Sequence, residues 1–167
     1  MSIQIAILTV SDRSFRGERE DLSGPALQAQ VVALGWQVWR VSIVPDEMDQ
    51  IAGTLSAWAD SGQVDVILTT GGTGFAPRDI TPEATRQVVE RLTPGLDEAM
   101  RAASLKITAH AMLSRALSGI RKRTLIVNLP GSPRGAVENF LTIAPVLPHA
   151  VELLHEDAAA EGGHRSL

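Results

Sequence analysis

The stretch Leu68–Thr85, LTTGGTGFAPRDITPEAT, contains residues suited to binding an anion. Its glycines can adopt positive φ and have no Cβ, so backbone N–H groups can approach a phosphate closely. Thr81-Pro82 predicts the start of a helix, and a helix N-terminus also favours anions. We therefore predict a phosphate-binding loop with Arg78 as a further contact, built from Gly71, Gly72, Thr73 and Gly74.

The spacing of this loop differs from the two common phosphate-binding signatures. It lacks GxxxxGK(S/T), no lysine follows its glycines, and it also lacks GxGxxG. A bound phosphate would therefore be held by backbone donors. A glycine-rich turn without a ligand explains the same residues about equally well, because short glycine motifs also occur at sites that bind nothing.

Two aspartates add carboxylate chemistry to the loop. Asp79 lies beside it, where a carboxylate repels an anion unless a cation intervenes, which predicts Mg²⁺. The simpler interpretation is a carboxylate that suits the dipole of the following helix. Asp46, in VPDEMDQ, is explained alone as a helix N-cap, with Asp49 completing a capping box. Paired with Asp79 across neighbouring strand ends, Asp46 becomes a second ligand for metal or substrate.

The other polar side chains give weaker signals. The four histidines have no metal-ligand spacing, and no GxSxG turn marks a nucleophilic serine. A group of basic residues either meets an anionic substrate or forms a charged, solvated hairpin face: Arg115, Arg121, Lys122 and Arg123.

Composition limits the class of protein. The 167 residues predict one domain, and the net charge of -4 argues against a general nucleic-acid-binding role. The absence of cysteine excludes disulfides, thiolate metal sites and a cysteine nucleophile. Neither a basic signal segment nor an apolar run of roughly 20 residues is present, so we expect a soluble, cytoplasmic domain without a membrane partner.

Hydrophobic patterns predict the elements that position these residues. Apolar runs predict buried strands at residues 3–10, 36–44, 64–70 and 124–129, with a hairpin turn at 121–123. Helices are expected to begin at Ser23, Asp46 and Pro82, and Leu34 and Leu92 are assigned to apolar helix faces. A further helix follows Pro94-Gly95, and the last helical region begins at residue 136 with interruptions near residues 145 and 148.

This alternation predicts an α/β three-layer sandwich, with a mostly parallel sheet, helices on both faces and a small hairpin. We expect a single domain at residues 1–155 and a flexible tail at 156–167. Ligands of such sheets bind beyond the carboxyl ends of the strands. Three loops of unusual composition fall there, at residues 11–24, 71–82 and 130–135, which predicts a ligand-binding site.

The glycine loop and seven further segments resemble, in order, the molybdenum-cofactor biosynthesis family, which includes molybdopterin adenylyltransferases and the equivalent domains of two-domain proteins such as gephyrin. The segments are ILTVSDR, Asp21–Leu27, VPDE, TPGLDEAMR, SLKIT, MLSR and LIVNLPGSP. The resemblance implies transfer of AMP from Mg-ATP to molybdopterin, with release of pyrophosphate. It also implies a homotrimer and hand-over of the product to a molybdate-insertion protein.

Site residues follow from the resemblance by position. It assigns Asp46 and Asp79 to the Mg-ATP step, as metal ligands and as the family's two essential acidic residues. It assigns Ser104 and Ser114 to the pterin side. The nucleotide loop is Gly71, Gly72, Thr73 and Gly74; Ser11 and Asp12 border the nucleotide; and Asn128, Pro130 and Gly131 form a strand-end loop lining the site.

Two departures from the family pattern lie beside the expected pterin site. Ala109-His110 replaces a pair that often contains proline, and Ser132 stands where many relatives have asparagine. Two other functions stay open: a non-catalytic molybdopterin carrier, and a nucleotide-pyrophosphate hydrolase related to the competence-damage-protein domain. The latter family has an Asp-Asp pair where this chain has Arg78-Asp79. The sequence does not distinguish a molybdenum from a tungsten pathway.

Overall fold

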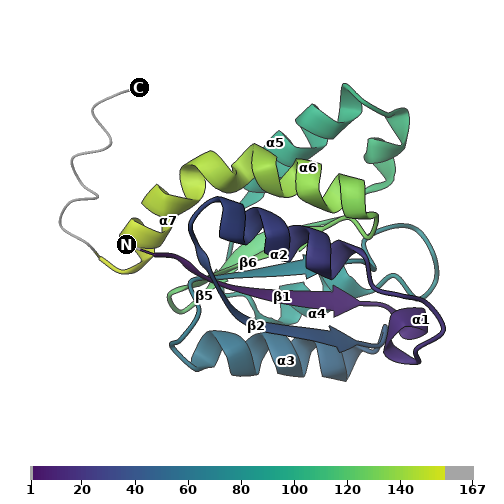
Figure 1. The fold of residues 1–167 in the computed structure, drawn as a ribbon, viewed down its shortest axis with the longest axis horizontal. Helices are drawn as coiled ribbons and strands as arrows, with labels where there is room; N and C mark the ends of the chain where they lie inside the picture. The colour runs from purple at the N-terminus through teal and green to yellow at the C-terminus, as the bar shows by residue number, and fades with distance from the viewer. Residues whose placement is uncertain (1, 157–167) are drawn as a thin grey trace.

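The computed structural model describes residues 2–156 (Figure 1). Its strands are β1 (Gln4–Val10), β2 (Gln37–Val44), β3 (Val66–Thr70), β4 (Arg91–Leu92), β5 (Ser118–Arg121) and β6 (Thr124–Leu129). Its helices are α1 (Asp12–Phe15), α2 (Ser23–Ala33), α3 (Met48–Asp60), α4 (Thr81–Val88), α5 (Pro94–Leu105), α6 (Pro133–Ile143) and α7 (Leu147–Leu154), with 3-10 segments η1 (Ala109–Leu113) and η2 (Ala144–Val146).

The strands form one sheet in the order β2-β1-β3-β6-β5-β4. The first four in this order are parallel, while β5 runs antiparallel to β6 and β4 antiparallel to β5. Helices α2, α5, α6 and α7 cover one face and α3 and α4 the other (Figure 1). The predicted three-layer α/β fold with a mostly parallel sheet is confirmed.

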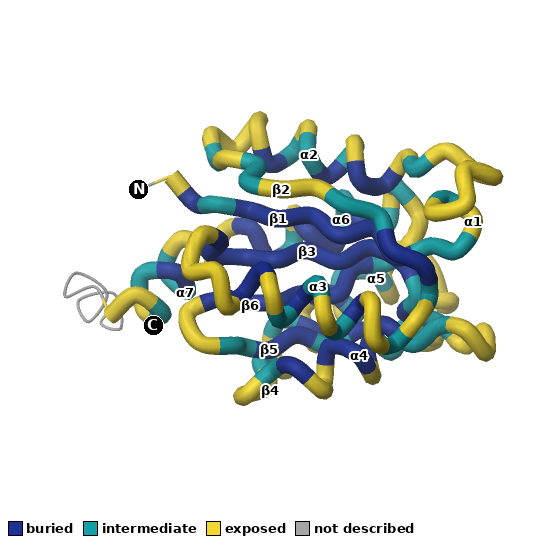
Figure 2. Tube along the Cα trace, turned by 90° about the horizontal axis from the view of Figure 1, so that it is seen from below, coloured by how far each residue is buried: buried dark blue, intermediate teal, exposed yellow. Residues whose placement is uncertain are grey.

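Burial on both faces explains why the central strands are continuous apolar runs. Along β1, Ile5 and Ile7 face the α2 side while Ala6 and Leu8 face the α3 side, and all four are 0% exposed. The inner strands are buried along their length, whereas much of β2 at the sheet edge is not (Figure 2). This rigid centre fixes the loops at the strand ends.

The predicted hairpin is confirmed at β5–β6, where Lys122 has a φ of 52° between the paired strands. No helix among residues 2–156 is long and apolar enough to cross a membrane. Glu156 lies in a turn after α7, and the remainder of the predicted tail, residues 157–167, lies outside the described residues. The domain boundary at residue 155 stays a prediction.

Several predicted helix details are wrong. Helix α4 ends at Val88, and Leu92 lies in β4 with 45% of its surface exposed. Leu34 is also exposed, because it follows the last helical residue of α2. Helix α6 begins at Pro133, three residues earlier than expected, since Ser132 Oγ accepts a capping hydrogen bond from Gly135 N. The predicted interruption near residue 145 is confirmed as η2, between α6 and α7. Pro148 lies in the first turn of α7, where proline is tolerated, and does not interrupt that helix.

Asp46 does not cap α3. Glu47 occupies the N-cap position and makes no side-chain capping bond, while the Asp46 carboxylate accepts from a different loop. Thr81 is the first helical residue of α4, after Ile80 as N-cap. The Asp46 carboxylate and the Thr81 hydroxyl are therefore available to the loops at the sheet edge, where Asp46 accepts from Asp12 N and Thr81 donates to Gly71 O.

Candidate functional site

The carboxyl ends of β1, β2, β3 and β6 lie along one edge of the sheet, and the loop at residues 71–74 separates two cavities there. We call the first, about 350 Å³, the acidic cavity. Its lining includes Ser11, Asp21, Asp46, Gly71, Gly72, Asp79 and Gly131. The second, about 280 Å³, is the α5–α6 cavity, lined by residues such as Thr73, Gly74, Ser104, Ser114 and Pro130.

The glycine loop requires glycine for steric reasons. Gly71 has a φ of 101° and Gly72 a φ of 68°, in the region that side chains with a Cβ rarely adopt. A Cβ on Gly71 would collide with the carbonyl oxygen of Val10, and one on Gly72 with the Thr81 hydroxyl. A Cβ on Gly131 would lie 3.2 Å from the Cα of Gly71. The loops after β1, β3 and β6 therefore meet at this point.

The loop presents unused backbone donors. Gly71 N donates to Leu129 O at 3.2 Å, which ties the loop to β6. The N–H groups of Gly72, Thr73 and Gly74 have no acceptor within residues 2–156. N–H groups without a protein partner bond to water or to a bound anion, so the loop offers donors for the predicted anion site.

Asp12 and Asp46 join the loops after β1 and β2. Asp12 N donates to Asp46 Oδ2 at 2.9 Å, and Asp46 N donates to Asp12 Oδ1 at 3.0 Å. Burial raises the pKa of the Asp46 carboxyl, and the charges of Asp12 and Asp79 raise it further. The strands that carry Asp46 and Asp79 are not neighbours, since β1 lies between them, yet the two carboxylates line the same cavity.

Arg78 is engaged by carboxylates. Its Nε lies 2.6 Å from Asp12 Oδ2, and its Nη2 lies 2.7 Å from Glu47 Oε1. The hydrogen bond from Arg78 holds the pKa of Asp12 below its ordinary value. The structure therefore places Arg78 between the carboxylates of Asp12 and Glu47. Arg78 and Asp12 both lie outside the lining of the acidic cavity.

The donor set fits Mg²⁺ held together with a phosphate ligand. Asp46 and Asp79 supply carboxylate oxygens to one cavity, and the hydrogen bond that Asp79 accepts, from Ala76 N, leaves other lone pairs unused. Within residues 2–156, no group of three or more His, Cys, Asp or Glu side chains forms a metal site. Mg²⁺ is commonly held by one or two carboxylates with substrate phosphates and water, so two carboxylates suffice.

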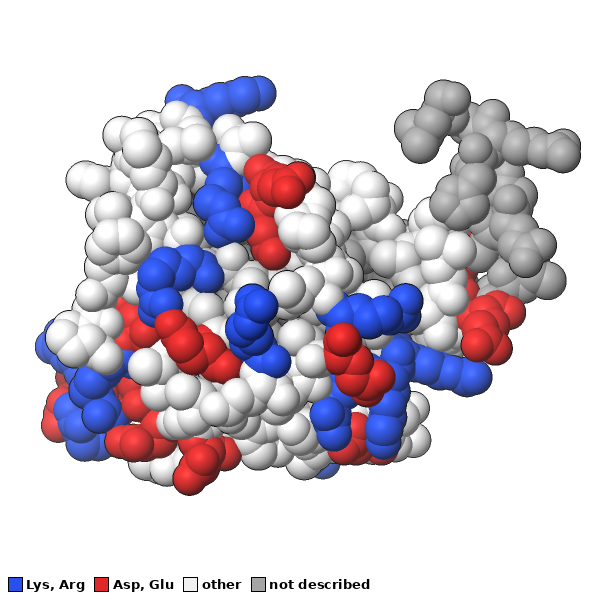
Figure 3. All heavy atoms as spheres, turned by 180° about the vertical axis from the view of Figure 1, so that it is seen from behind, with Lys and Arg blue, Asp and Glu red and all other residues white. Residues whose placement is uncertain are grey.

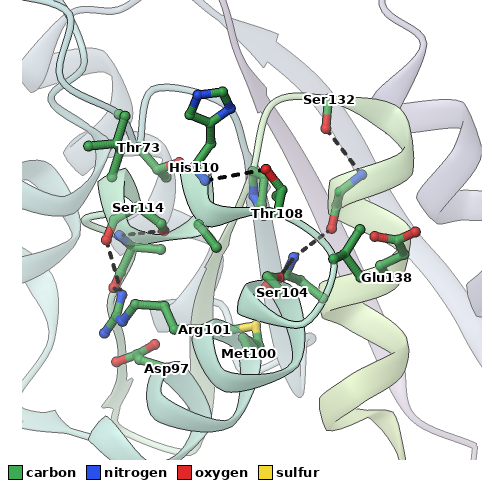
Figure 4. Close-up of a pocket in the computed structure, with 18 residues that line it drawn as sticks. Thr73, Asp97, Met100, Arg101, Ser104, Thr108, His110, Ser114, Ser132 and Glu138 are labelled. Atoms are coloured by element: carbon green, nitrogen blue, oxygen red, sulfur yellow. Dashed lines mark hydrogen bonds between the residues drawn. The ribbon is translucent and has the colours of Figure 1, made fainter.

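The α5–α6 cavity contains the two serines predicted for the pterin side. Ser104 projects from α5, and Ser114 follows η1 (Figure 4). His110 also lines it, as does Ser132, which lines the acidic cavity as well. Each departure from the family pattern thus places a residue in this cavity, His110 from the first and Ser132 from the second. Ser132 lines both cavities.

Lining residues missed by the sequence interpretation include Asp97, Arg101 and Asn139. Asp97, Arg101 and Ser104 recur at helical spacing, so a polar stripe on α5 was a usable signal. Burial raises the pKa of Asp97, although its carboxylate accepts from Ser118 N at 3.1 Å and Ser118 Oγ at 2.9 Å. No sequence pattern points to Asn139.

Asn128 is a core residue. It is 0% exposed, lines neither cavity, and its Nδ2 donates to Thr69 Oγ1 at 3.0 Å and Thr85 Oγ1 at 2.9 Å. Its Oδ1 accepts from Leu117 N at 3.3 Å. Every predicted site residue except Asp12, Arg78 and Asn128 lines one of the two cavities.

The basic residues separate into two groups. Arg115 braces the glycine loop, donating from Nε to Gly74 O at 2.8 Å and from Nη2 to Asp79 O at 2.5 Å, and pairs with Glu83. Arg121 and Lys122 pair with Asp60 at the opposite end of the sheet, so they are remote from the cavities. Blue and red side chains lie beside one another on the face seen in Figure 3, as expected for a charged, solvated surface.

Comparison with known proteins agrees with this geometry. The family described as "Probable molybdopterin binding domain" matches residues 6–149, and the chain belongs to this family. The chain is 44% identical over 155 residues to the molybdopterin adenylyltransferase of Helicobacter pylori, covering 92% of this chain and 88% of that protein.

Two further comparisons extend the likeness. The molybdenum cofactor synthesis protein cinnamon of Drosophila melanogaster is 48% identical over 160 residues, and the match covers 95% of this chain but 26% of that protein. The chain therefore spans about a quarter of the length of that relative. The crystal structure of the molybdopterin biosynthesis enzyme MoaB from Thermus thermophilus superposes with a TM-score of 0.87 at 49% identity, covering 93% of this chain and 98% of that one.

Proposed function

We propose that this chain is a molybdopterin adenylyltransferase, an enzyme of molybdenum cofactor biosynthesis that transfers AMP from ATP to molybdopterin. The observation that carries this proposal is the pair of cavities that meet at the glycine loop and share Ser132. The acidic cavity offers carboxylates, the α5–α6 cavity offers hydroxyls between two helices, and the loop between them carries free backbone donors. Relatives that align over most of their length bear the same name.

The acidic cavity is the proposed site for Mg-ATP. Gly72 lines this cavity, while Thr73 and Gly74 line the α5–α6 cavity, so the N–H groups of the three residues would donate to phosphate oxygens where the two cavities meet. Asp46 and Asp79 would hold Mg²⁺. When bound, Mg²⁺ supplies Lewis-acid stabilisation of the phosphoryl oxygens. Ser11 borders the same cavity. Arg78 keeps the adjacent Asp12 paired, which limits the negative charge that faces the triphosphate.

The α5–α6 cavity is the proposed site for molybdopterin, with Ser104 and Ser114 as contacts. In this arrangement the terminal phosphate of the pterin lies near Ser132 and attacks the α-phosphorus of ATP. A new P–O bond forms, the bond between the α- and β-phosphates breaks, and pyrophosphate leaves. No protein nucleophile is needed, because positioning in the two cavities and neutralisation of charge lower the barrier.

The assembly and setting of the enzyme form part of the same proposal. We infer a cytoplasmic homotrimer that hands adenylylated molybdopterin to a molybdate-insertion protein, as the resemblance to the family implies. Sedimentation equilibrium of the purified chain tests the trimer, for which a monomer mass at working concentration is the contrary result.

One incubation tests the activity. Purified protein, molybdopterin, ATP and Mg²⁺ are combined, and the pterin is then analysed by mass spectrometry. The expected result is addition of AMP to the pterin with an equal amount of pyrophosphate, and loss of both when Mg²⁺ is chelated. Tight pterin binding without product supports a carrier instead, and release of pyrophosphate without pterin modification supports a hydrolase.

Ser104→Ala separates the two halves of the site. Since Ser104 lines the α5–α6 cavity and not the acidic cavity, its loss should raise KM for molybdopterin about tenfold, the effect of one net hydrogen bond of roughly 1–1.5 kcal/mol. KM for ATP should change less than twofold. Steady-state kinetics with each substrate varied in turn measure both values, and the reverse ranking would mean that the cavity assignments are exchanged.

A further inference from the structure

A chain of hydrogen bonds runs along one wall of the α5–α6 cavity (Figure 4). Gly135 N donates to Ser132 Oγ at 3.1 Å. Asn139 Nδ2 donates to Gly135 O at 2.8 Å and to Ser104 Oγ at 3.1 Å. These hydrogen bonds therefore connect Ser132, which lines both cavities, with Ser104 on the opposing helix α5.

The direction of these bonds sets the role of the Ser104 hydroxyl. An amide nitrogen only donates, so Ser104 Oγ must accept from Asn139. The Ser104 hydroxyl proton has no acceptor within residues 2–156, although its residue lines the cavity. That proton is free to be donated to a ligand. The Asn139 side chain, which makes Ser104 Oγ an acceptor on this side, is 7% exposed, and its two amide N–H groups are both used, toward Ser104 Oγ and Gly135 O.

We propose that Asn139 is a positioning residue for the pterin, holding Ser104 as a hydrogen-bond donor toward an acceptor atom of the substrate. This inference rests on the proposed function, because it takes the α5–α6 cavity as the pterin site. The pterin ring offers carbonyl oxygen and ring nitrogen acceptors of the required kind. The same amide connects Ser104, through Gly135, with Ser132, which lines both cavities.

Asn139→Asp tests the polarity with little change in shape. A carboxylate has no N–H, so it accepts the Ser104 proton and turns the hydroxyl away from the cavity, and it also loses the bond to Gly135 O. The expected result is an affinity for molybdopterin about tenfold lower, with ATP affinity unchanged. Equilibrium binding of molybdopterin to the purified chain without ATP, and of ATP without molybdopterin, measures both.

A double-mutant cycle distinguishes positioning from a general loss of packing. If Asn139 acts through Ser104, the variant carrying both Ser104→Ala and Asn139→Asp binds molybdopterin as weakly as Ser104→Ala alone. Thr142→Ala is the matched control, because this hydroxyl lies one turn further along α6 and donates to Glu138 O. The control should bind both substrates normally.

Thermal melting first establishes that each variant is folded. Asn139→Ser, whose side chain is too short to reach Ser104, replaces Asn139→Asp if the latter does not fold, with the same expected loss. Unchanged molybdopterin affinity in the folded variant, or losses that add in the cycle, would overturn the inference while leaving an active wild-type enzyme as proposed. Failure of the wild-type chain to bind molybdopterin would overturn both.

Discussion

Asp79→Asn should lower the rate of AMP transfer by about 10³-fold or more, because several kcal/mol of charge stabilisation on phosphoryl oxygens depends on a metal held by this carboxylate. Asparagine keeps an acceptor for the hydrogen bond from Ala76 N, so the loop should keep its shape. The change removes one negative charge from the acidic cavity and leaves the α5–α6 cavity intact. Initial rates of pyrophosphate release at saturating substrates measure the effect.

Asp49→Asn is the matched control for this prediction. Asp49 is an exposed carboxylate in the first turn of α3, close in sequence to Asp46 but outside both cavities. It should retain full activity and full Mg²⁺ dependence. Near-normal turnover by Asp79→Asn, at Mg²⁺ concentrations where the wild type is saturated, would show that this carboxylate does not hold the metal.

Local patterns predicted the parts of the fold that are determined by burial. Residues 3–10 and 124–129 are apolar on both faces, and such runs form central parallel strands wherever helices cover the sheet. The hairpin at Lys122 was likewise predictable from the charged residues 121–123 that precede the apolar run at 124–129, although the strand before the turn, β5, was not predicted. The position of Leu92 in a strand was not predictable, because its spacing fits a helix face and only its pairing with β5 makes it part of a strand.

The site was predictable to the extent that its residues follow strand ends. Parallel strands bring their carboxyl ends to one edge, which is why Asp46 and Asp79 meet although 33 residues separate them. The pairing of Arg78 with Asp12 joins loops 66 residues apart, and no local pattern carries that information. The same holds for Asn139, whose role depends on the packing of α6 against α5.

Asn128→Ala should lower the free energy of unfolding by about 3 kcal/mol, a large part of the 5–15 kcal/mol of an ordinary domain. The change removes the acceptor of Leu117 N and the donor shared by the Thr69 and Thr85 hydroxyls, in a position without access to water. Thermal melting should show a midpoint lower by roughly 10 °C for a chain of this length. The substrate affinities of the folded fraction should change little.

Thr85→Val supplies the control, since it removes one partner of the same amide. Because the two changes break a shared bond, their combined cost should be smaller than the sum of the single costs. A melting midpoint equal to that of the wild type, with a raised KM for molybdopterin, would instead give Asn128 the direct binding role that the family resemblance implies. The two results differ because a buried amide with all its hydrogen bonds inside the protein stabilises the sheet below the site, whereas a ligand contact must reach the cavity.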